Sequence, residues 1–429
     1  MEFEAEQAVI LASGTEGDNL GILTEELPPA LLPVANRPLL SFQLELLEQA
    51  RGFRQVLVLT FERWLSRLST YISEHYKGAL QVELLVVPND SSSADALRHI
   101  KPKLTSDFVL LAGDVISDVS FHHLADLHRL HRAAVTCLFK QSPPRELVNG
   151  TMVKKAKELD GIDFVGMDKE KRRLLYLEPS ADCDKGTLGV SQSLLRKEPH
   201  LQIHTDLTDA HVYIFSHWVL EVLESKPHFA SIKFELVPYL VHKQFLTKPA
   251  PVQESVGSSV KPSSSGIPEE FCCCCSVMPH DSGYCVRANS LPSYVQANMD
   301  VAKGGLTRFE KLPEVNEAVK EGNFALRSFS ADSSRGVGVD VSNGCVIKKS
   351  CVGPHCTIGS NVRLTNCIIM DHVKISDKVT IANSIICSNA EICEGVSLKD
   401  AQVGFNVTVE AGAVIKGEAI SQGDLEDDE

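Results

Sequence analysis

The 429-residue chain lacks the features that would direct it to a membrane or to a nucleic acid. No run of about 18 apolar residues occurs, so we expect no transmembrane helix. The opening sequence MEFEAEQAVILAS has no basic residue ahead of a long apolar stretch, so we expect no signal peptide. Acidic residues outnumber basic ones by 56 to 42, which gives a formal net charge of -14. Because nucleic acids and anionic membranes reward basic surfaces, we expect neither as a partner.

The chain has thirteen cysteines, and we expect no secretory signal. Together these features indicate free thiols in a reducing compartment, with the cytosol as the simplest localisation. Four of the cysteines are consecutive, from Cys272 to Cys275. Consecutive thiols lack the spaced pairs of a tetrahedral zinc site, so we expect no metal there. The run predicts an unstructured or loosely packed cysteine cluster.

Positive charge is also missing from one loop near the N-terminus. Residues 11–40 read LASGTEGDNLGILTEELPPALLPVANRPLL, in which an apolar strand end runs into small residues and glycines, as in phosphate-binding loops. Yet no Lys or Arg lies between Val9 and Asn36, whereas four carboxylates do: Glu16, Asp18, Glu25 and Glu26. The loop therefore has the shape of a phosphate site without the charge that phosphate requires.

The first 247 residues alternate short β-rich runs with longer amphipathic ones, which predicts an α/β domain with a mostly parallel sheet and helices on both faces. The expected strands are 8–11, 55–60, 82–87, 108–112, 135–139 and 211–215. The expected helices are 41–50, 62–75, 93–104, 121–130, 217–224 and 232–243. In such sheets the ligand site lies where loops leave the carboxyl ends of strands, here the opening loop and the segment 110–118.

The composition changes after this domain. The segment KPAPVQESVGSSVKPSSSGIPEE is rich in Pro, Ser and Gly, and it cannot bury enough apolar surface to offset the entropy of ordering it. We therefore expect residues 248–336 to be a flexible connector.

A hexapeptide repeat follows the connector. Val, Ile or Leu occupies every position of a pattern that advances by six residues within a group and by 17 between groups: 352, 358, 364; 369, 375, 381; 386, 392, 398; 403, 409, 415. Three such sides close one coil, and stacked coils bury the aliphatic ladder, so the pattern predicts a parallel β-helix over residues 337–420. This β-helix is either a rigid spacer or a surface that pairs with another subunit, and we favour pairing. Residues 421–429 are expected to be a solvated acidic tail.

This arrangement resembles the sugar-nucleotide pyrophosphorylases, whose loop typically reads L-A-G-G-x-G-T-R-L-x-P-L-T and is followed by P-K-P-L-L-P-V. The resemblance implies a Rossmann-like nucleotidyltransferase domain followed by a left-handed β-helix. Leu11-Ala12 match the motif and Ser13-Gly14 stand for its Gly pair, but Asp18 replaces the Arg and Pro29 the Lys. Asp114 matches the metal aspartate of the family, whereas Ser92-Ser93-Ala94 departs from its base-binding G-T-A.

The two missing cations bear directly on catalysis, because nucleotidyl transfer depends on positive charge around the phosphoryl oxygens. Two unit charges ~4 Å apart interact by about 4 kcal/mol at an effective dielectric of about 20. We therefore expect no enzyme activity, no catalytic residues, no metal and no cofactor. Ser13, Gly14 and Asp114 remain as vestigial nucleotide-binding residues.

A closer resemblance is to the gamma-subunit family of eukaryotic translation initiation factor 2B, the guanine-nucleotide exchange factor for initiation factor 2. LRHIKPKL (97–104), HTDLTDAHVYIF (204–215), ELVPYLVHKQF (235–245) and the repeat carry it. It implies a non-catalytic subunit that supports the catalytic epsilon subunit, with the other subunits of the factor and initiation factor 2 as partners. The epsilon family adds a helical-repeat domain that performs exchange, for which we expect no room after the last coil.

Two alternatives stay open. The chain could be an active sugar-phosphate nucleotidyltransferase with substitute cations, for which Lys101, Lys103 and Lys140 are available. Alternatively, the old cleft could hold a nucleotide or sugar nucleotide as a regulatory ligand.

Overall fold

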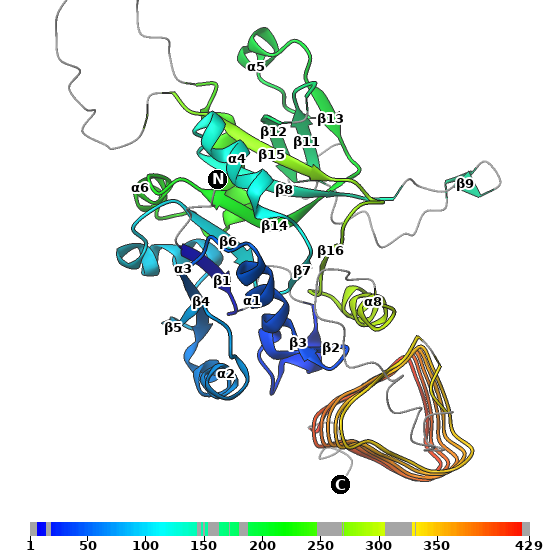
Figure 1. Ribbon diagram of the computed structural model, residues 1–429. Coiled ribbons are helices and arrows are strands. Elements are labelled where there is room, and N and C mark those ends of the chain that lie inside the picture. The colour runs from blue at the N-terminus through cyan, green and yellow to red at the C-terminus, as the bar shows by residue number, and fades with distance from the viewer. Residues whose placement is uncertain are drawn as a thin grey trace, which may run out of the picture. The chain divides into compact units, whose positions relative to one another are not determined.

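The protein divides into two compact units, each built from two stretches of sequence. The first combines Met1–Glu16 with Leu46–Cys285, and the second combines Gly17–Glu45 with Val286–Glu429. The computed structural model describes residues 7–13, 19–143, 147–148, 151–152, 163–170, 172–179, 188–246, 268, 270–304, 328–330 and 332–422 (Figure 1). Within these ranges, no helix combines the length and the apolar character needed to cross a bilayer.

The first unit is organised around a seven-stranded sheet of order β15-β8-β14-β6-β1-β4-β5. Its strands are β1 (Gln7–Leu11), β4 (Gln55–Phe61), β5 (Gln81–Val87), β6 (Phe108–Ala112), β8 (Val135–Gln141), β14 (Leu207–Phe215) and β15 (Cys273–Met278). β1 pairs in parallel with both β4 and β6, while β14 runs antiparallel to its neighbours β6 and β8. The predicted α/β fold with a mostly parallel sheet is confirmed.

Helices pack around this sheet close to their predicted positions: α2 (Glu62–His75), α3 (Ser93–Ile100), α4 (Phe121–His131), α6 (Val219–Ser225) and α7 (Val237–Lys243), with α1 (Leu39–Gln49) spanning the two units. α3 ends before the predicted residue 104, because Pro102 cannot continue it, and a 3-10 turn η3 (Lys101–Lys103) follows. The predicted helix 232–243 begins instead as a π-helix, η6 (Ile232–Leu236).

A smaller sheet of order β12-β11-β13 was not predicted from the sequence. It consists of β11 (Asp163–Met167), β12 (Leu174–Pro179) and β13 (Gln202–His204), and the short helix α5 (Gln192–Lys197) precedes β13 in the chain. Val165 and Met167 on β11 are fully buried in the same core cluster as residues of the large sheet. β11 therefore contributes side chains to the main core.

The predictions of a flexible connector and of a loose cysteine cluster are wrong over residues 271–302. Here the chain forms β15, β16 (Cys285–Arg287) and α8 (Leu291–Ala302). β15 pairs in parallel with β8, which places Cys275 opposite Cys137. Cys273 and Cys275 lie in the main core, and Cys274 packs on the other face with Leu127 and Ala133. A strand covered on both faces needs an unbroken apolar run, and Cys serves as a small hydrophobe. Residues 248–267, 269, 305–327 and 331 of the predicted connector lie outside the described residues.

The second unit contains the predicted β-helix, which is seen end-on as a triangle in Figure 1. One side holds β17 (Ser334–Arg335), β20 (Cys351–Val352), β23 (Ile368–Ile369), β26 (Ile385–Ile386), β29 (Gln402–Val403) and β32 (Ala419–Ile420). The second holds β18 (Asp340–Val341), β21 (Thr357–Ile358), β24 (Lys374–Ile375), β27 (Glu391–Ile392) and β30 (Thr408–Val409). The third holds β19 (Val346–Lys348), β22 (Arg363–Thr365), β25 (Thr380–Ala382), β28 (Ser397–Lys399) and β31 (Val414–Lys416).

Register and corners explain why this sequence forms coils. Ile358 lies opposite Ile375, and Ile375 opposite Ile392, so the predicted aliphatic ladder stacks coil on coil. The corners require a left-handed backbone, which Gly and Asn tolerate best. The corner residues with positive φ are Gly338, Gly344, Lys349, His355, Asn361, Asn366, His372, Lys378, Asn383, Asn389, Gly395, Asp400, Asn406, Gly412 and Gly417.

The passage after the N-terminal loop belongs to this second unit. β2 (Pro33–Val34) and β3 (Arg37–Pro38) form a hairpin whose Asn36 Nδ2 donates hydrogen bonds to Val352 O at 3.0 Å and to Ser334 Oγ at 3.1 Å. On α8, Tyr294 donates from its hydroxyl to Pro33 O at 2.6 Å. The hairpin is thus bonded both to the first coils of the β-helix and to α8.

Candidate functional site

The predicted nucleotide loop leaves β1 beside the turn that follows β6. The backbone N–H of Gly113 donates to Leu11 O at 3.0 Å, and a Cβ on Gly113 would lie only 2.5 Å from that oxygen. A glycine is therefore required where the two strand ends approach. Ser13 is half-buried just after β1, and Asp114 is buried in the turn between β6 and β7 (Val115–Ser117). Gly14 lies outside the described residues, as do Glu16 and Asp18.

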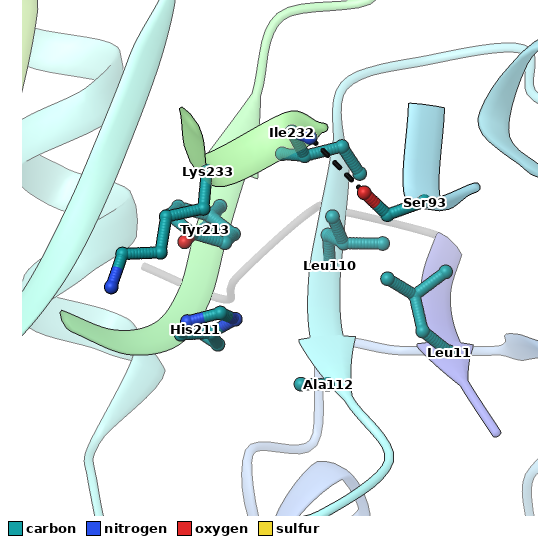
Figure 2. Close-up of a pocket in the computed structure, with 8 residues that line it drawn as sticks. All are labelled: Leu11, Ser93, Leu110, Ala112, His211, Tyr213, Ile232 and Lys233. Carbon is teal, nitrogen blue, oxygen red and sulfur yellow. Dashed lines mark hydrogen bonds between the residues drawn. The ribbon is translucent and has the colours of Figure 1, made fainter. Parts of the chain in front are cut away.

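A pocket lies close to this edge of the sheet, with about 320 Å³ of atom-free space that is partly open to solvent. Figure 2 shows its two sides: apolar residues Leu11 and Leu110 on one, and His211, Tyr213 and Lys233 on the other. Ser93, Ala112 and Ile232 complete the lining. Neither Ser13 nor Asp114 lines this pocket, so two of the predicted nucleotide-binding residues lie outside its wall.

Ser92 and Ser93, which stand where the resembling family has its base-binding G-T-A motif, accept local hydrogen bonds. Ser92 caps α3 by accepting from Asp95 N at 3.2 Å. Ser93 Oγ accepts from the backbone N–H of Ile232 at 3.1 Å, shown as the dashed line in Figure 2. This bond ties the start of α3 to the start of η6 and so holds η6 over the pocket.

The π-helix η6 positions the one lysine of the pocket lining. Ser231 caps it by accepting from Phe234 N at 2.9 Å, and Glu235 Oε2 accepts from Ser231 N at 2.8 Å. From this first turn, Lys233 extends its Nζ to within 3.0 Å of Asp163 Oδ2, and the Asp163 side chain is only 3% exposed. The contact is an ion pair, since Asp163 Oδ2 makes no well-oriented hydrogen bond among the described residues.

A second buried carboxylate, Asp209, lies on β14, the strand that carries His211 and Tyr213 of the pocket lining. Its Oδ2 accepts from the Tyr213 hydroxyl at 2.5 Å, and its Oδ1 accepts from His211 N at 2.8 Å. Burial raises the pKa of Asp209, and the positive charge of Lys233 opposes that rise. His211 adopts a left-handed backbone with φ 52°, which accompanies a register shift of β14 against β8.

The three lysines considered as substitute cations are bound elsewhere. Lys101 pairs with Glu221 at 2.9 Å and with Glu224 at 2.6 Å. Lys103 pairs with Glu83, and Lys140 Nζ donates to Pro279 O at 2.8 Å. None of the three lines the pocket. Sequence reasoning missed Lys233 and Asp163, although Lys233 follows a capping serine at a helix start.

The polar side chains of the pocket lining are therefore one ammonium that is already paired, an imidazole, a phenol and the Ser93 hydroxyl, on an otherwise apolar wall. Among the residues described, no group of three or more His, Cys, Asp or Glu side chains is placed to hold a metal ion. The arrangement offers space and hydrogen-bonding groups, but little uncompensated positive charge.

The fold and site define a class: a nucleotidyltransferase-type α/β domain followed by a left-handed β-helix. A family model described as Nucleotidyl transferase matches residues 7–155, and one described as EIF2B subunit epsilon LbH domain matches residues 328–415.

Curated relatives narrow this class. The translation initiation factor eIF2B subunit gamma of Dictyostelium discoideum is 33% identical, over 82% of this chain and 88% of its own. The subunit gamma of Schizosaccharomyces pombe is 30% identical, over 72% and 68%. The epsilon subunit of D. discoideum is 27% identical, over 54% of this chain but only 32% of its own. The chain belongs to the family of eIF2B gamma subunits, and is thus a translation initiation factor subunit.

Proposed function

We propose that this chain is a non-catalytic subunit of the guanine-nucleotide exchange factor for initiation factor 2. In this role it supports the catalytic epsilon subunit and promotes exchange of GDP for GTP. Its partners are the epsilon subunit, the other subunits of factor 2B and initiation factor 2 itself. We propose that it acts in the cytosol without binding nucleic acid or membrane.

The observation that carries the non-catalytic role is the charge of the former nucleotide site. The motif lysine is replaced by Pro29, which is buried in the 3-10 turn η2 (Pro29–Leu31) and carries no charge. The motif arginine is replaced by Asp18. The lysine that does line the pocket, Lys233, is paired with Asp163. A triphosphate would thus meet little of the positive charge that phosphoryl transfer needs.

A reconstitution experiment tests the proposal. The purified chain, the epsilon subunit and the pair of both are each mixed with initiation factor 2 loaded with a fluorescent GDP, and nucleotide release is followed. We expect the chain alone to leave release at its spontaneous rate, and the pair to release GDP faster than epsilon alone. Exchange by the chain alone, or no gain from adding it to epsilon, would contradict the proposal.

The loss of transferase chemistry needs a separate assay. The chain is incubated with sugar phosphates, nucleoside triphosphates and Mg²⁺, and pyrophosphate release is measured. We expect none above the background without protein. Turnover that disappears in Asp114→Ala would establish an active enzyme instead.

The pocket favours a second candidate, a regulatory module that binds a nucleotide or sugar nucleotide. The rings of His211 and Tyr213 and the Lys233 ammonium on its wall are groups that contact the base and the phosphates of such ligands. Thermal melting across a panel of nucleotides and sugar nucleotides tests it. A rise in melting temperature that Tyr213→Ala removes would support binding, and unchanged melting across the panel would argue against it.

A further inference from the structure

The outward-facing residues of the β-helix differ from one side to the next, although the backbone repeats. On the first side Ile368 and Ile385 point away from the coil interior and are nevertheless buried. On the second side Lys374 lies opposite Glu391 of the next coil, so neighbouring charges have opposite signs. The third side follows neither pattern.

The third side, formed by β19, β22, β25, β28 and β31, presents positive charge without negative charge. The central residue of each strand faces the coil interior, so the residues before and after it point outward. We call these outward residues the basic face. Four of them are the cations Lys348, Arg363, Lys399 and Lys416, and the others are Thr, Ser, Ala and Val.

No carboxylate of the described residues neutralises the basic face. None of its four cations has an ion-pair partner within the described ranges, whereas Lys378 at a corner pairs with Glu394 at 2.7 Å. Lys399 lies directly opposite Lys416 of the next coil, and like charges in that position repel. The acid beside Lys399 in the chain, Asp400, is at a corner and accepts from Asn383 Nδ2 at 3.0 Å. The basic face therefore carries a repulsion that an anionic partner would relieve.

Apolar residues at both ends of the basic face indicate which kind of anion fits it. Val346 on β19 is 41% exposed, and Val414 on β31 is 79% exposed. A nucleic acid would offer phosphates to the cations, but a chain with a net charge of -14 repels so dense a polyanion. A polypeptide offers both carboxylates for the cations and apolar side chains for the two valines.

We propose that the basic face docks an acidic segment of a partner protein. The carboxylates of that segment bind the four cations, and its apolar side chains contact Val346 and Val414. Complementary charge of this kind speeds association and selects the partner. This surface goes beyond the proposed function, which names partners but no part of the chain that contacts them.

The test uses the purified full chain and a fluorescein-labelled peptide built of repeated Glu-Leu-Asp-Val units. Binding is followed by fluorescence anisotropy at low and at high NaCl concentration, and a labelled single-stranded oligonucleotide is the competing polyanion. Lys399→Ala/Lys416→Ala removes the opposed lysines, and Val414→Ser removes the more exposed valine. Lys374→Ala on the second side is the matched control. A chain without residues 423–429 tests whether its own acidic end competes for the face.

We expect wild type to bind the peptide, and high NaCl to weaken this binding. Lys399→Ala/Lys416→Ala should weaken it by roughly five- to tenfold, and Val414→Ser by about threefold. Lys374→Ala should change it by less than about twofold. The double variant should melt no lower than wild type, because it removes two cations that repel each other. Removal of residues 423–429 should leave peptide binding unchanged.

Five other results would overturn the inference. The first is a wild type that does not bind the peptide, and the second is equal binding by wild type and the double variant. The third is tighter binding of the oligonucleotide than of the peptide. The fourth is a double variant that melts well below wild type. The fifth is peptide binding that appears only without residues 423–429, since the chain itself would then fill the face. These readouts concern the chain alone, so they are independent of whether it promotes GDP release with epsilon.

Discussion

The backbone N–H of Ala35 donates a 2.8 Å hydrogen bond to Asn298 Oδ1, although 263 positions separate the two residues. Ala35 and Asn36 form the tip of the β2–β3 hairpin with φ values of 48° and 69°, as in the turns that suit two-residue hairpins. Asn298 lies on α8 and donates from Nδ2 to Tyr294 O at 3.0 Å. The LLPV passage that resembles a pyrophosphorylase motif is thus part of the unit that contains the β-helix.

This contact predicts the effect of Asn298→Ala. Ala35 is fully buried, so its N–H would lose its partner without gaining water. We expect a loss of about 2 kcal/mol in the free energy of unfolding of this unit. Urea denaturation and hydrogen exchange at Ala35 measure it. The matched control is Gln296→Ala on the exposed side of α8, whose hydrogen bond to Asp300 is at the surface. Equal effects of the two variants would contradict the assigned role of Asn298.

The left-handed corners of the β-helix predict a second result. Asn383 has φ 51°, accepts from Asn366 Nδ2 and donates to Asp400 Oδ1 at 3.0 Å. Asn383→Val should cost about 2 kcal/mol, because a β-branched residue is strained in this conformation. Asn383→Gly is the control and should cost less, since glycine adopts the conformation freely. Equal thermal stability of the two variants would refute the backbone argument.

The close approach of β1 and the turn after β6 predicts a third result. In Gly113→Ala the new methyl group would lie 2.5 Å from Leu11 O, so one strand end must move. We expect a destabilisation of about 2–3 kcal/mol in chemical denaturation. Gly189→Ala is the control, because nothing lies within 4 Å of a Cβ there. A Gly113→Ala variant as stable as Gly189→Ala would show that the strand ends separate easily.

The buried histidine His128 predicts how stability depends on pH. Burial lowers its pKa to about 4, and its ring contacts Thr136 Oγ1 at 2.9 Å and Ser216 Oγ at 3.3 Å. The unfolded chain binds a proton at His128 near pH 6.5, whereas the native chain resists it until about pH 4. The contribution of neutral His128 to the free energy of unfolding is therefore complete above pH 6.5. This contribution is lost as the pH falls toward 4, by up to about 3 kcal/mol.

The variant His128→Gln isolates this contribution. At pH 8 it should be less stable than wild type, and the difference should shrink as the pH is lowered to 4.5. Urea denaturation of both proteins at several pH values gives the comparison. A difference that stays constant over this range would show that His128 does not titrate as inferred.

The cysteine strand predicts selective alkylation. A hydrogen bond from Cys274 lowers the pKa of the half-buried Cys272 to about 7, whereas burial raises that of Cys273. Iodoacetamide should therefore modify Cys272 before Cys273, Cys274 and Cys275, with half-maximal rate near pH 7. Peptide mass spectrometry reads the order, and Cys272→Ser is the control. Earlier modification of Cys273 or Cys275 would contradict the buried strand.

Much of the fold could be predicted from the sequence, because the repeat and the alternation of strands and helices show in the spacing of apolar residues along the chain. The aliphatic ladder from Val352 to Ile415 predicted the β-helix, and the alternation of runs in the first 247 residues predicted six strands of the large sheet. The cysteine run did not predict the strand β15, because four consecutive thiols do not reveal whether both faces of a strand are covered. β15 is buried only because β8 and the surrounding helices lie against it.

The candidate site could be predicted only in part. Leu11, Ser13 and Asp114 lie at one edge of the sheet, as predicted, because the parallel strands β1 and β6 end together. Their role in binding a nucleotide stays a prediction. The pairing of Lys233 with Asp163 could not be predicted, since Asp163 lies on a strand that no local pattern identified and 70 residues separate the two. Whether a lysine faces a buried carboxylate depends on long-range packing, which periodicity does not encode.

By itself the sequence determined the α/β domain, the coiled repeat and the missing cations of the loop, since each is a property of neighbouring residues. Only the tertiary structure decided that the cysteine run is a core strand, that the LLPV hairpin bonds to α8 and the β-helix, and that Lys233 neutralises Asp163. The physical reason is burial: the energy of a charge or an apolar side chain depends on what surrounds it, and distant segments supply those surroundings.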